Sequence, residues 1–506
     1  MTERWKRLKS GSDIRGVAVA EENAQAELTE DVGVSVGRAF ARWLGARTGK
    51  AVVRIAVGRD SRVTGEALEA AMMRGLSFER AEVMHCGLCT TPAMFMTTVL
   101  AQCDGAVMVT ASHLPWQRNG YKFFTAEGGL ESGDILTLLE AASFLRPDGS
   151  EQPPTEMAFL DDYTAFLSQY VRTALDDAGD APLEGLHVVV DAGNGAGGFY
   201  ARMLKTLGAC VDGSQFLEPD GRFPNHIPNP EDAHAMESLC AAVRSAGADL
   251  GVIFDADCDR AALVDGEGRA INRNRLIALI SAVLLRESPG ATIVTDSVVS
   301  AGLDDFLSAH GGTLHRFKRG YKNVIDEARR LCGEGTDCPL AIETSGHAAL
   351  RENHFLDDGM YLATRLIVEA VRCKRAGTTL CSLIASLAEP REAAEVRMPL
   401  RAADFRAAGE AILAHVEQAA AAREGWAVDS GNREGVRVLC GAKSEWCLLR
   451  LSVHDPLLVL NAESDRCGGV AAMLRALREM LGGQSALDIS ALDARLTENQ
   501  EGESNA

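Results

Sequence analysis

Three aspartates at alternate positions, Asp255, Asp257 and Asp259, follow a short apolar run in the middle of the chain. Side chains at every second position of an extended segment point to the same side, so these carboxylates are expected to converge. Two carboxylates about 4 Å apart repel by about 4 kcal/mol at an effective dielectric constant of about 20, so three of them need a cation. All-oxygen ligands favour Mg²⁺ over zinc or copper, and a solvated acidic turn is the alternative.

A serine, Ser112, lies in the polar stretch Thr-Ala-Ser-His-Leu-Pro, directly after the apolar run GAVMV. Open α/β sheets bind ligands at the carboxyl ends of their strands, so this hydroxyl is a candidate nucleophile. A turn or capping residue is the alternative, and the hexapeptide alone favours the turn. Lys122 follows in Asn-Gly-Tyr-Lys-Phe and can orient a phosphate or move a proton, although it can equally be a surface lysine.

Two arginine-containing segments and one glutamate–histidine cluster supply further candidates. Arg15 lies in Ser-Gly-Ser-Asp-Ile-Arg-Gly, and residues 58–62 read Gly-Arg-Asp-Ser-Arg. A guanidinium group matches two phosphate oxygens, which makes both segments candidate phosphate sites, with an ordinary ion pair as the alternative. Glu343 and Ser345 can bind sugar hydroxyls, and the nearby His347 can act as an acid or base, although a lone histidine is more often structural.

The elements that must position these groups alternate along the chain. Val- and Ile-rich runs that stop at Gly or Asp predict buried strands at residues 51–58, 186–191 and 249–255. Apolar spacing near 3.6 predicts helices at residues 64–76 and 160–175. This alternation indicates α/β domains with mostly parallel sheets.

A glycine-rich stretch at residues 191–198 follows one of the predicted strands. It lacks the G-x-G-x-x-G spacing of a dinucleotide-binding loop, and it also lacks the lysine of a P-loop. The stretch therefore predicts a tight turn from a strand into a helix.

Composition limits the classes of function. The chain has 506 residues and a formal net charge of −20, which repels nucleic acid and anionic membranes and requires any phosphate site to be locally basic. The first ten residues contain no apolar secretory core, and no apolar run reaches the roughly 18 residues of a membrane span. The 13 cysteines are scattered, which is typical of a reducing compartment, so we expect a cytoplasmic protein.

Chain length and polar connecting segments predict the domain organisation. A chain of this length is expected to form three or four domains. Polar, proline-containing stretches at 147–154 and 389–393 indicate connections between them. The predicted domains are residues 1–157, 158–272, 273–391 and 392–490, with a flexible tail at 491–506.

Taken together, these motifs resemble the α-D-phosphohexomutase family, in particular its phosphomannomutase/phosphoglucomutase branch. Each motif alone is weak, but the matching segments occur in the family's order. They are residues 10–16, 58–62, 110–115, 119–123, 191–195, 220–230, 255–260, 320–322, 343–347 and 358–359.

The resemblance implies a fold of three three-layer α/β/α domains with mixed sheets and a smaller C-terminal α+β domain around one cleft. It implies that Ser112 carries a phosphate, and that Ser112, Asp255, Asp257 and Asp259 hold one Mg²⁺ per chain. The implied reaction interconverts mannose or glucose 1-phosphate and 6-phosphate, with a hexose 1,6-bisphosphate as intermediate and activator. A phosphoglucosamine mutase, a catalytically weak sugar-phosphate-binding relative and a serine phosphatase are the alternatives.

The resemblance also implies roles for the cationic residues. Lys122 and Arg15 become candidate acid–base or charge-stabilising groups, and His347 lies close to the substrate. Arg260 is expected beside the metal, where it helps the intermediate to turn. The partners are then small sugar phosphates rather than nucleic acid or membrane, and the protein is expected to be a monomer or homodimer.

The substrate-binding residues implied by the resemblance include Glu343, Ser345, Gly320 and Tyr321. Glu343 and Ser345 would hold the 3- and 4-hydroxyls of the sugar. Thr344, between these two, is neither the Met of the mannose/glucose branch nor the Gln of the glucosamine branch.

The C-terminal phosphate loop departs from the family pattern R-x-S-[GN]-T-E-P. Here it reads Arg-Leu-Ser-Val-His-Asp-Pro, and Arg450, Ser452 and His454 are its candidate binding residues. Loss of two charge-assisted hydrogen bonds, at about 1.5–3 kcal/mol each, would weaken phosphate binding by about 10²–10⁴-fold. His454 can recover part of that loss.

Overall fold

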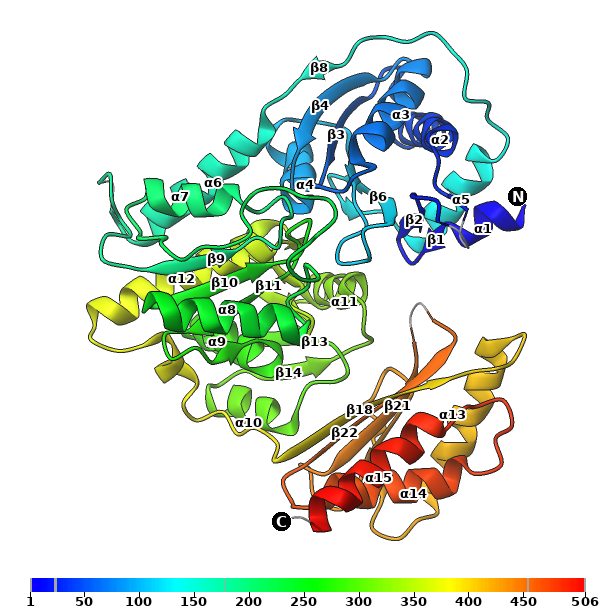
Figure 1. Cartoon of the computed structure of the whole chain (residues 1–506), viewed down its shortest axis with the longest axis vertical. Helices are drawn as coiled ribbons and strands as arrows, with labels where there is room; N and C mark the ends of the chain where they lie inside the picture. Colours follow the sequence, from blue (N-terminus) through cyan, green and yellow to red (C-terminus); the bar gives the residue numbers. More distant parts are fainter. Residues whose placement is uncertain (1, 22–24, 178, 453–454, 505–506) are drawn as a thin grey trace. The chain divides into compact units, whose positions relative to one another are not determined.

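The computed structural model describes residues 2–21, 25–177, 179–452 and 455–504, coloured along the chain in Figure 1. It divides into two compact units. The first contains Met1–Leu276 and Ser345–Leu383, and the second contains Ile277–Thr344 and Ile384–Ala506. Most predicted site residues of the phosphoryl-transfer end therefore belong to one unit.

A mixed sheet forms the N-terminal part of the first unit. Its parallel centre consists of β3 (Arg54–Arg59), β4 (Glu82–Leu88) and β5 (Gly105–Val109). Beside β5, the strand β6 (Arg118–Thr125) runs antiparallel, and it also pairs antiparallel with β2 (Asp13–Val17). The strand order is β1-β2-β6-β5-β3-β4-β8, with β7 beside β6. The remaining short strands are β1 (Lys9–Ser10), β7 (Gly128–Gly129) and β8 (Thr155–Glu156).

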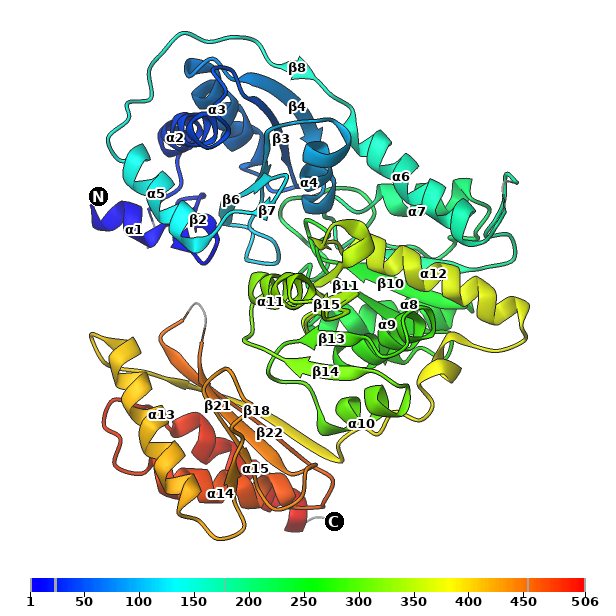
Figure 2. The same ribbon diagram turned by 180° about the vertical axis from the view of Figure 1, so that it is seen from behind.

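Helices cover this sheet. The helices α2 (Glu30–Thr48) and α3 (Gly65–Phe78) lie side by side (Figures 1 and 2). They share one apolar core with the sheet and with α5 (Ser132–Ala142). The helix α4 (Thr91–Leu100) packs against β3, β5 and β6. A short helix, α1 (Glu3–Arg7), lies at the N-terminus. The loop that follows β5 is thus supported by a sheet with covered strands.

A second mixed sheet of the first unit carries the acidic motif. Its order is β12-β11-β10-β9, with β9 and β10 parallel and the other pairs antiparallel. The helix α8 buries an apolar face against β9, β10 and β11. As predicted, the glycine-rich stretch after β9 is a turn that leads into α7. The elements are α6 (Phe159–Ala174), β9 (Val188–Asp191), α7 (Phe199–Thr206), α8 (Ala233–Ala246), β10 (Leu250–Phe254), β11 (Ala261–Asp265) and β12 (Ala270–Ile271).

The third sheet has the order β14-β13-β15-β16-β17. Its strands β14, β13 and β15 are parallel, whereas β16 and β17 form an antiparallel pair. The strands are β13 (Thr292–Thr295), β14 (Thr313–Arg316), β15 (Leu340–Ile342), β16 (Ala348–Leu350) and β17 (Leu356–Asp357). The accompanying helices are α9 (Arg273–Glu287), α10 (Ala301–Ala309), α11 (Tyr321–Gly333), η1 (Arg351–Asn353), α12 (Gly359–Arg375) and η2 (Leu380–Ile384).

The C-terminal sheet is antiparallel, in the order β18-β22-β21-β20-β19. Helices α13, α14 and α15 share its apolar core. The tail expected to be flexible from residue 491 instead continues this domain, because Leu492 and Leu496 of α15 are buried in that core. The elements are β18 (Glu392–Pro399), α13 (Phe405–Ala421), β19 (Ala427–Val428), β20 (Val436–Leu439), β21 (Trp446–Leu451), β22 (Leu457–Ser464), α14 (Gly469–Leu481) and α15 (Ser490–Ser504).

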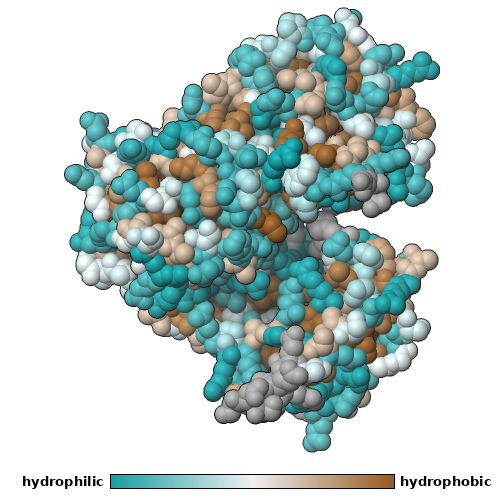
Figure 3. All heavy atoms as spheres, in the orientation of Figure 1, coloured by the Kyte–Doolittle hydropathy of each residue, from teal (hydrophilic) through white to brown (hydrophobic). Residues whose placement is uncertain are grey.

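The face of the molecule drawn in Figure 3 is mostly hydrophilic. Hydrophobic residues on the face in Figure 3 occur singly or in small groups among hydrophilic ones. Among the described residues, no helix combines the length and the apolar character that a membrane crossing requires.

Candidate active site

Ser112 lies in the loop between β5 and β6 and is buried. Its φ of 53° falls in the left-handed region, which is uncommon for a residue with a side chain. The Ser112 Oγ donates to Asp255 Oδ2 at 2.8 Å, and Arg260 Nη2 donates to the same Oγ at 3.1 Å. The structure therefore brings the predicted phosphate carrier to the first aspartate of the acidic motif and to the neighbouring guanidinium.

The three aspartates of the motif lie in the turn that joins β10 to β11. The sequence predicted an extended segment, and that prediction is wrong, because β10 ends at Phe254 and the turn includes a left-handed Cys258 with φ 66°. The turn itself makes the carboxylates converge. Asp255, Asp257 and Asp259 each offer one oxygen, and all three oxygens lie within 4.8 Å of one another.

Two cations partly neutralise these carboxylates. The Lys122 Nζ lies 3.1 Å from Asp257 Oδ2 and also forms an ion pair with Asp259. The Arg260 Nη2 lies 3.0 Å from Asp255 Oδ2. Burial alone would raise the pKa of Asp259, but the charges of Lys122, His347 and Arg260 lower it. The pKa of Asp255 is raised instead, by burial and by the negative charge of Asp259. With His347 and its partner Asp357 included, four carboxylates face three cations, so the cluster still attracts a further positive charge.

The donor set fits a divalent cation with oxygen ligands. Asp257 Oδ1 and Asp259 Oδ1 are buried and have no hydrogen-bond partner in the described part of the chain. A buried acceptor without a donor is costly, and a hard cation such as Mg²⁺ satisfies carboxylate oxygens of this kind. The Thr91 Oγ1, at the start of α4, donates to Asp257 Oδ2 at 2.5 Å, so Asp257 Oδ1 is the oxygen that remains available to a cation.

His347 lies beside the same cluster. Its backbone pairs with Arg260, and its Nδ1 is 2.6 Å from Asp357 Oδ2 and 3.7 Å from Asp259 Oδ1. Burial alone would lower the pKa of His347, but the Asp357 and Asp259 carboxylates overcome this and raise the pKa to about 9. Sequence reasoning missed Asp357, although an aspartate pair before a glycine at the end of a strand was a visible signal.

Arg15 lies on β2, opposite Gly120 of β6 and therefore close along the sheet to Lys122. Its Nη2 donates to Asp13 Oδ2 at 2.8 Å. The positive charge of Arg260 is the largest of the effects that lower the pKa of His113, followed by burial and by the charge of Arg15. This neutral His113, whose Nδ1 is 3.2 Å from Ser112 Oγ, is a further neighbour of the serine that sequence reasoning missed.

The segment at residues 58–62 was considered as a phosphate site, and the structure favours the ion-pair alternative for its last residue. The Arg62 Nε donates to Asp60 Oδ2 at 3.2 Å, and both side chains are fully buried. Burial raises the pKa of Asp60 to about 6, against the opposing charge of Arg62.

Several substrate-binding candidates belong to the second unit. The Gly320 N donates to Glu343 Oε1 at 2.5 Å, and Gly320, with φ 119°, directly precedes α11, which begins at Tyr321. The structure thus joins the 320–321 loop to Glu343. Ser345, assigned to the first unit, is buried in the turn after β15.

The residue between Glu343 and Ser345 is held away from solvent. Thr344 donates to Asp296 Oδ2 through both its N, at 3.1 Å, and its Oγ1, at 2.6 Å. Asp296 is a buried residue that sequence reasoning missed.

The structure describes part of the altered phosphate loop at residues 450–456. Arg450 on β21 is buried, and burial lowers its pKa. The Ser452 Oγ accepts a hydrogen bond from Asp455 N at 3.2 Å. His454 lies outside the described residues.

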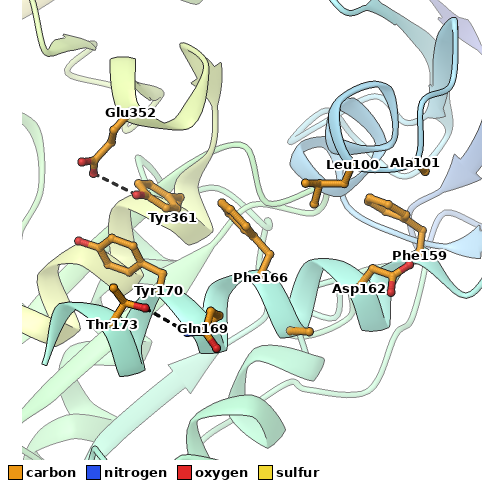
Figure 4. Close-up of a pocket in the computed structure, with 11 residues that line it drawn as sticks. Leu100, Ala101, Phe159, Asp162, Phe166, Gln169, Tyr170, Thr173, Glu352 and Tyr361 are labelled. Atoms are coloured by element: carbon orange, nitrogen blue, oxygen red, sulfur yellow. Dashed lines mark hydrogen bonds between the residues drawn. The ribbon is translucent and has the colours of Figure 1, made fainter. Parts of the chain in front are cut away.

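A cavity of about 670 Å³ lies apart from these residues, between α4, α6 and α12. Figure 4 shows Leu100, Phe166, Tyr170 and Tyr361 around it, with Glu352 bonded to the Tyr361 hydroxyl. Its lining, all within the described part of the chain, includes none of the predicted site residues. The candidate active site is therefore defined by the buried cluster around Ser112.

Three models of the phosphoglucomutase/phosphomannomutase family match the chain in order. They describe its alpha/beta/alpha domain I at residues 6–144, domain II at 161–268 and domain III at 272–390.

Curated relatives extend the similarity over most of the chain. It is 33% identical to a phosphomannomutase/phosphoglucomutase from Pseudomonas syringae over 361 residues, which cover 70% of this chain and 72% of that protein. It is 30% identical to a phosphoglucomutase from Neisseria gonorrhoeae over 459 residues, covering 90% and 92%. It is also 31% identical to a phosphomannomutase from Escherichia coli over 476 residues, covering 90% and 95%.

A solved structure shares the fold. A phosphoglucomutase/phosphomannomutase family protein from Burkholderia thailandensis superposes with a TM-score of 0.77 at 26% identity, covering 96% of this chain and 98% of that chain.

Proposed function

This chain belongs to the phosphoglucomutase/phosphomannomutase family of α-D-phosphohexomutases, and from that premise we propose that Ser112 is its phosphate carrier. As a phosphohexomutase, the protein is an isomerase that moves a phosphoryl group within a hexose phosphate. The observation that carries the proposal is the position of Ser112 Oγ, bonded to both Asp255 and Arg260 inside a buried cluster.

Two phosphoryl transfers make up the proposed reaction. A free hydroxyl of the hexose phosphate attacks the phosphorus of phosphoserine, the bond from phosphorus to Ser112 Oγ breaks, and a hexose 1,6-bisphosphate forms. The sugar hydroxyl loses its proton and the serine oxygen gains one. After the intermediate turns, Ser112 Oγ accepts the other phosphoryl group, and the sugar oxygen takes up the proton. Uncatalysed hydrolysis of phosphate monoesters is extremely slow, so phosphoserine can persist between turnovers.

Cationic side chains are suited to stabilise charge in these transfers. The Lys122 Nζ forms ion pairs with Asp257 and Asp259, so we propose it as an acid–base or charge-stabilising group beside the acidic motif. Arg260 donates to the oxygen at which the phosphoryl bond breaks and forms. His347, with its raised pKa, can supply a proton to a departing oxygen, and Arg15 contributes positive charge nearby.

The acidic cluster is proposed to hold one Mg²⁺ through Asp255, Asp257, Asp259 and the Ser112 phosphate. Bound there, the ion would neutralise charge on the phosphoryl oxygens. Asp257 Oδ1 and Asp259 Oδ1, which have no hydrogen-bond partner among the described residues, support this assignment.

We propose mannose or glucose phosphate as the substrate. Relatives named phosphomannomutase and phosphoglucomutase support mannose and glucose phosphates. Glu343, Ser345, Gly320 and Tyr321 are proposed to bind the sugar. Glucosamine phosphate is the second candidate. Thr344, whose Oγ1 donates to Asp296, is neither the residue of the mannose/glucose branch nor that of the glucosamine branch at this position.

Coupled assays with mannose, glucose and glucosamine 1-phosphates test this proposal. We expect turnover of mannose or glucose 1-phosphate that requires a trace of hexose 1,6-bisphosphate. Turnover of glucosamine 1-phosphate alone would establish the second candidate. No turnover of any of the three sugar phosphates would indicate a catalytically weak sugar-phosphate-binding relative. Steady release of phosphate would indicate a phosphatase.

Arg450 is proposed to bind the substrate's non-transferred phosphate together with Ser452 and His454. Replacing Arg450 with alanine should raise KM for the hexose phosphate by about 10–100-fold, the equivalent of one charge-assisted hydrogen bond, with a smaller change in kcat. Arg397→Ala is the matched control, because Arg397 lies on β18 of the same domain and pairs with Glu395 at the surface. An unchanged KM in Arg450→Ala would refute the role.

The domain boundaries, the cellular location and the oligomeric state are also proposed. We retain the predicted domain boundaries up to residue 490 and extend the last domain through α15. No disulfide bond joins cysteines in the part of the chain that the structure describes, which supports a cytoplasmic location. A monomer or homodimer is proposed, and light scattering after size-exclusion chromatography distinguishes the two.

A further inference from the structure

The guanidinium group of Arg62 lies at the centre of the loop that carries Ser112. Its Nη1 donates to the carbonyl oxygens of Pro115 at 3.0 Å and Arg118 at 2.8 Å. Its Nη2 donates to the carbonyl oxygens of Leu114, at 2.7 Å, and of Ser112 itself. With the bond from Nε to Asp60, all five N–H donors of the side chain are used.

Asp60 extends this clamp to the other side of Ser112. The Thr110 Oγ1 donates to Asp60 Oδ2 at 2.7 Å, and Ser112 N donates to Thr110 Oγ1 at 2.8 Å. The backbone on both sides of Ser112 is therefore anchored to one buried ion pair. Such anchoring can hold a non-glycine residue in the left-handed conformation observed here.

Arg62 also contacts a segment that supports Arg260. The backbone of Arg62 bridges to Gly221, where an added Cβ would collide with the backbone of residues 61–63. The Arg62 Cζ lies 5.2 Å from the centre of the Phe223 ring. Further along that segment, Asn229 Oδ1 accepts a hydrogen bond from Arg260 Nη1 at 3.2 Å.

We propose that Arg62 is a positioning residue for phosphoryl transfer. It holds Ser112 Oγ within hydrogen-bond distance of Asp255 and Arg260, and it connects the serine loop to the 221–229 segment. Arg62 does not touch the reacting oxygen. It acts through the backbone carbonyl of Ser112 and through the packing against Gly221 and Phe223. The inference rests on the proposed role of Ser112 as phosphate carrier, but the loop geometry can be tested independently.

Arg62→Met and Arg62→Lys test the proposal. Methionine preserves much of the side-chain length but leaves four loop carbonyls without their donor, and lysine has only three donors in a different geometry. A displacement of about 1 Å at a reacting group costs about 10²-fold in rate, so kcat of Arg62→Met should fall by about that factor while KM stays close to wild type. Arg62→Lys should recover only part of this loss.

Arg38→Met is the matched control in the same domain. The Arg38 side chain also clamps a loop, through Nη1 bonds to the carbonyl oxygens of Arg146 and Asp148 at 2.8 and 2.9 Å. Its removal should affect stability without a specific loss of kcat per folded molecule.

Two further readouts separate positioning from a general structural defect. A loosened serine loop should admit water, so Arg62→Met should release more phosphate per product formed than wild type. Amide hydrogen exchange should accelerate at residues 110–118 in Arg62→Met and near residues 146–148 in Arg38→Met.

Wild-type turnover and phosphate release in Arg62→Met would overturn the proposal. So would exchange that accelerates uniformly across the first unit, with kcat falling only in proportion to the folded fraction. If wild-type protein never carries phosphate on Ser112, the carrier assignment fails instead, and the local exchange at 110–118 still decides whether Arg62 holds the loop.

Discussion

Ser112→Ala is expected to lose the covalent phosphate and to reduce kcat by about 10⁴-fold or more, since removal of a nucleophile abolishes the covalent route. Wild-type protein incubated with glucose 1,6-bisphosphate should show the mass of one added phosphate in intact-mass spectrometry, and the variant should show none. The same coupled assay that reports turnover of the sugar 1-phosphates measures the change in kcat.

A second variant separates the nucleophile from the loop that carries it. Ser112 has φ 53°, a conformation that glycine adopts without the strain of a Cβ. Ser112→Gly should therefore be at least as stable as Ser112→Ala while remaining equally inactive. Ser77→Ala is the control, because Ser77 is a buried serine of the same domain whose Oγ bonds to the Arg74 carbonyl in α3. Phosphate retained in Ser112→Ala would show that another residue is the carrier.

Asp257→Asn is expected to weaken Mg²⁺ binding by more than about 10²-fold, a loss at least as large as that seen when groups supporting metal ligands are removed. Asparagine keeps the shape of the side chain and its acceptor for Thr91, but it removes the charge of the partnerless Oδ1. Activity at limiting Mg²⁺ should fall in parallel. The rise in melting temperature with added Mg²⁺ measures the affinity directly, because a ligand stabilises the folded state according to its concentration and Kd.

The same substitution should stabilise the metal-free protein. With the pair of His347 and Asp357 included, the three cations of the cluster balance three carboxylates better than four. The free energy of unfolding in chelator should rise by roughly 1–2 kcal/mol, a fraction of the roughly 4 kcal/mol with which two charges 4 Å apart interact.

Asp265→Asn is the control for this experiment. Asp265 ends β11 in the same sheet and pairs with Arg269 at 2.9 Å, outside the acidic cluster. This variant should lose some stability and keep its response to Mg²⁺. A wild-type Mg²⁺ response in Asp257→Asn would exclude Asp257 as a ligand.

The α/β class of the fold could be predicted from sequence because it depends on local patterns. The predicted strand at 249–255 corresponds to β10 (Leu250–Phe254), and the predicted helix at 160–175 corresponds to α6 (Phe159–Ala174). The C-terminal tail could not be predicted in this way. Its segment is polar and poor in apolar residues, and α15 is stabilised by the burial of Leu492 and Leu496 in the apolar core that the sheet and helices of this domain share.

Within the candidate site, sequence by itself determined the chemistry available: three carboxylates close together in the chain, a serine after a strand and a set of cations. Only the tertiary structure decided which of them meet. Ser112 and Asp255 are 143 positions apart, and Lys122 and Asp259 are 137 apart. Contacts over such separations depend on how whole sheets pack rather than on local spacing, so the buried cluster around Ser112, and the Arg62 clamp that supports it, emerged only when the chain was folded.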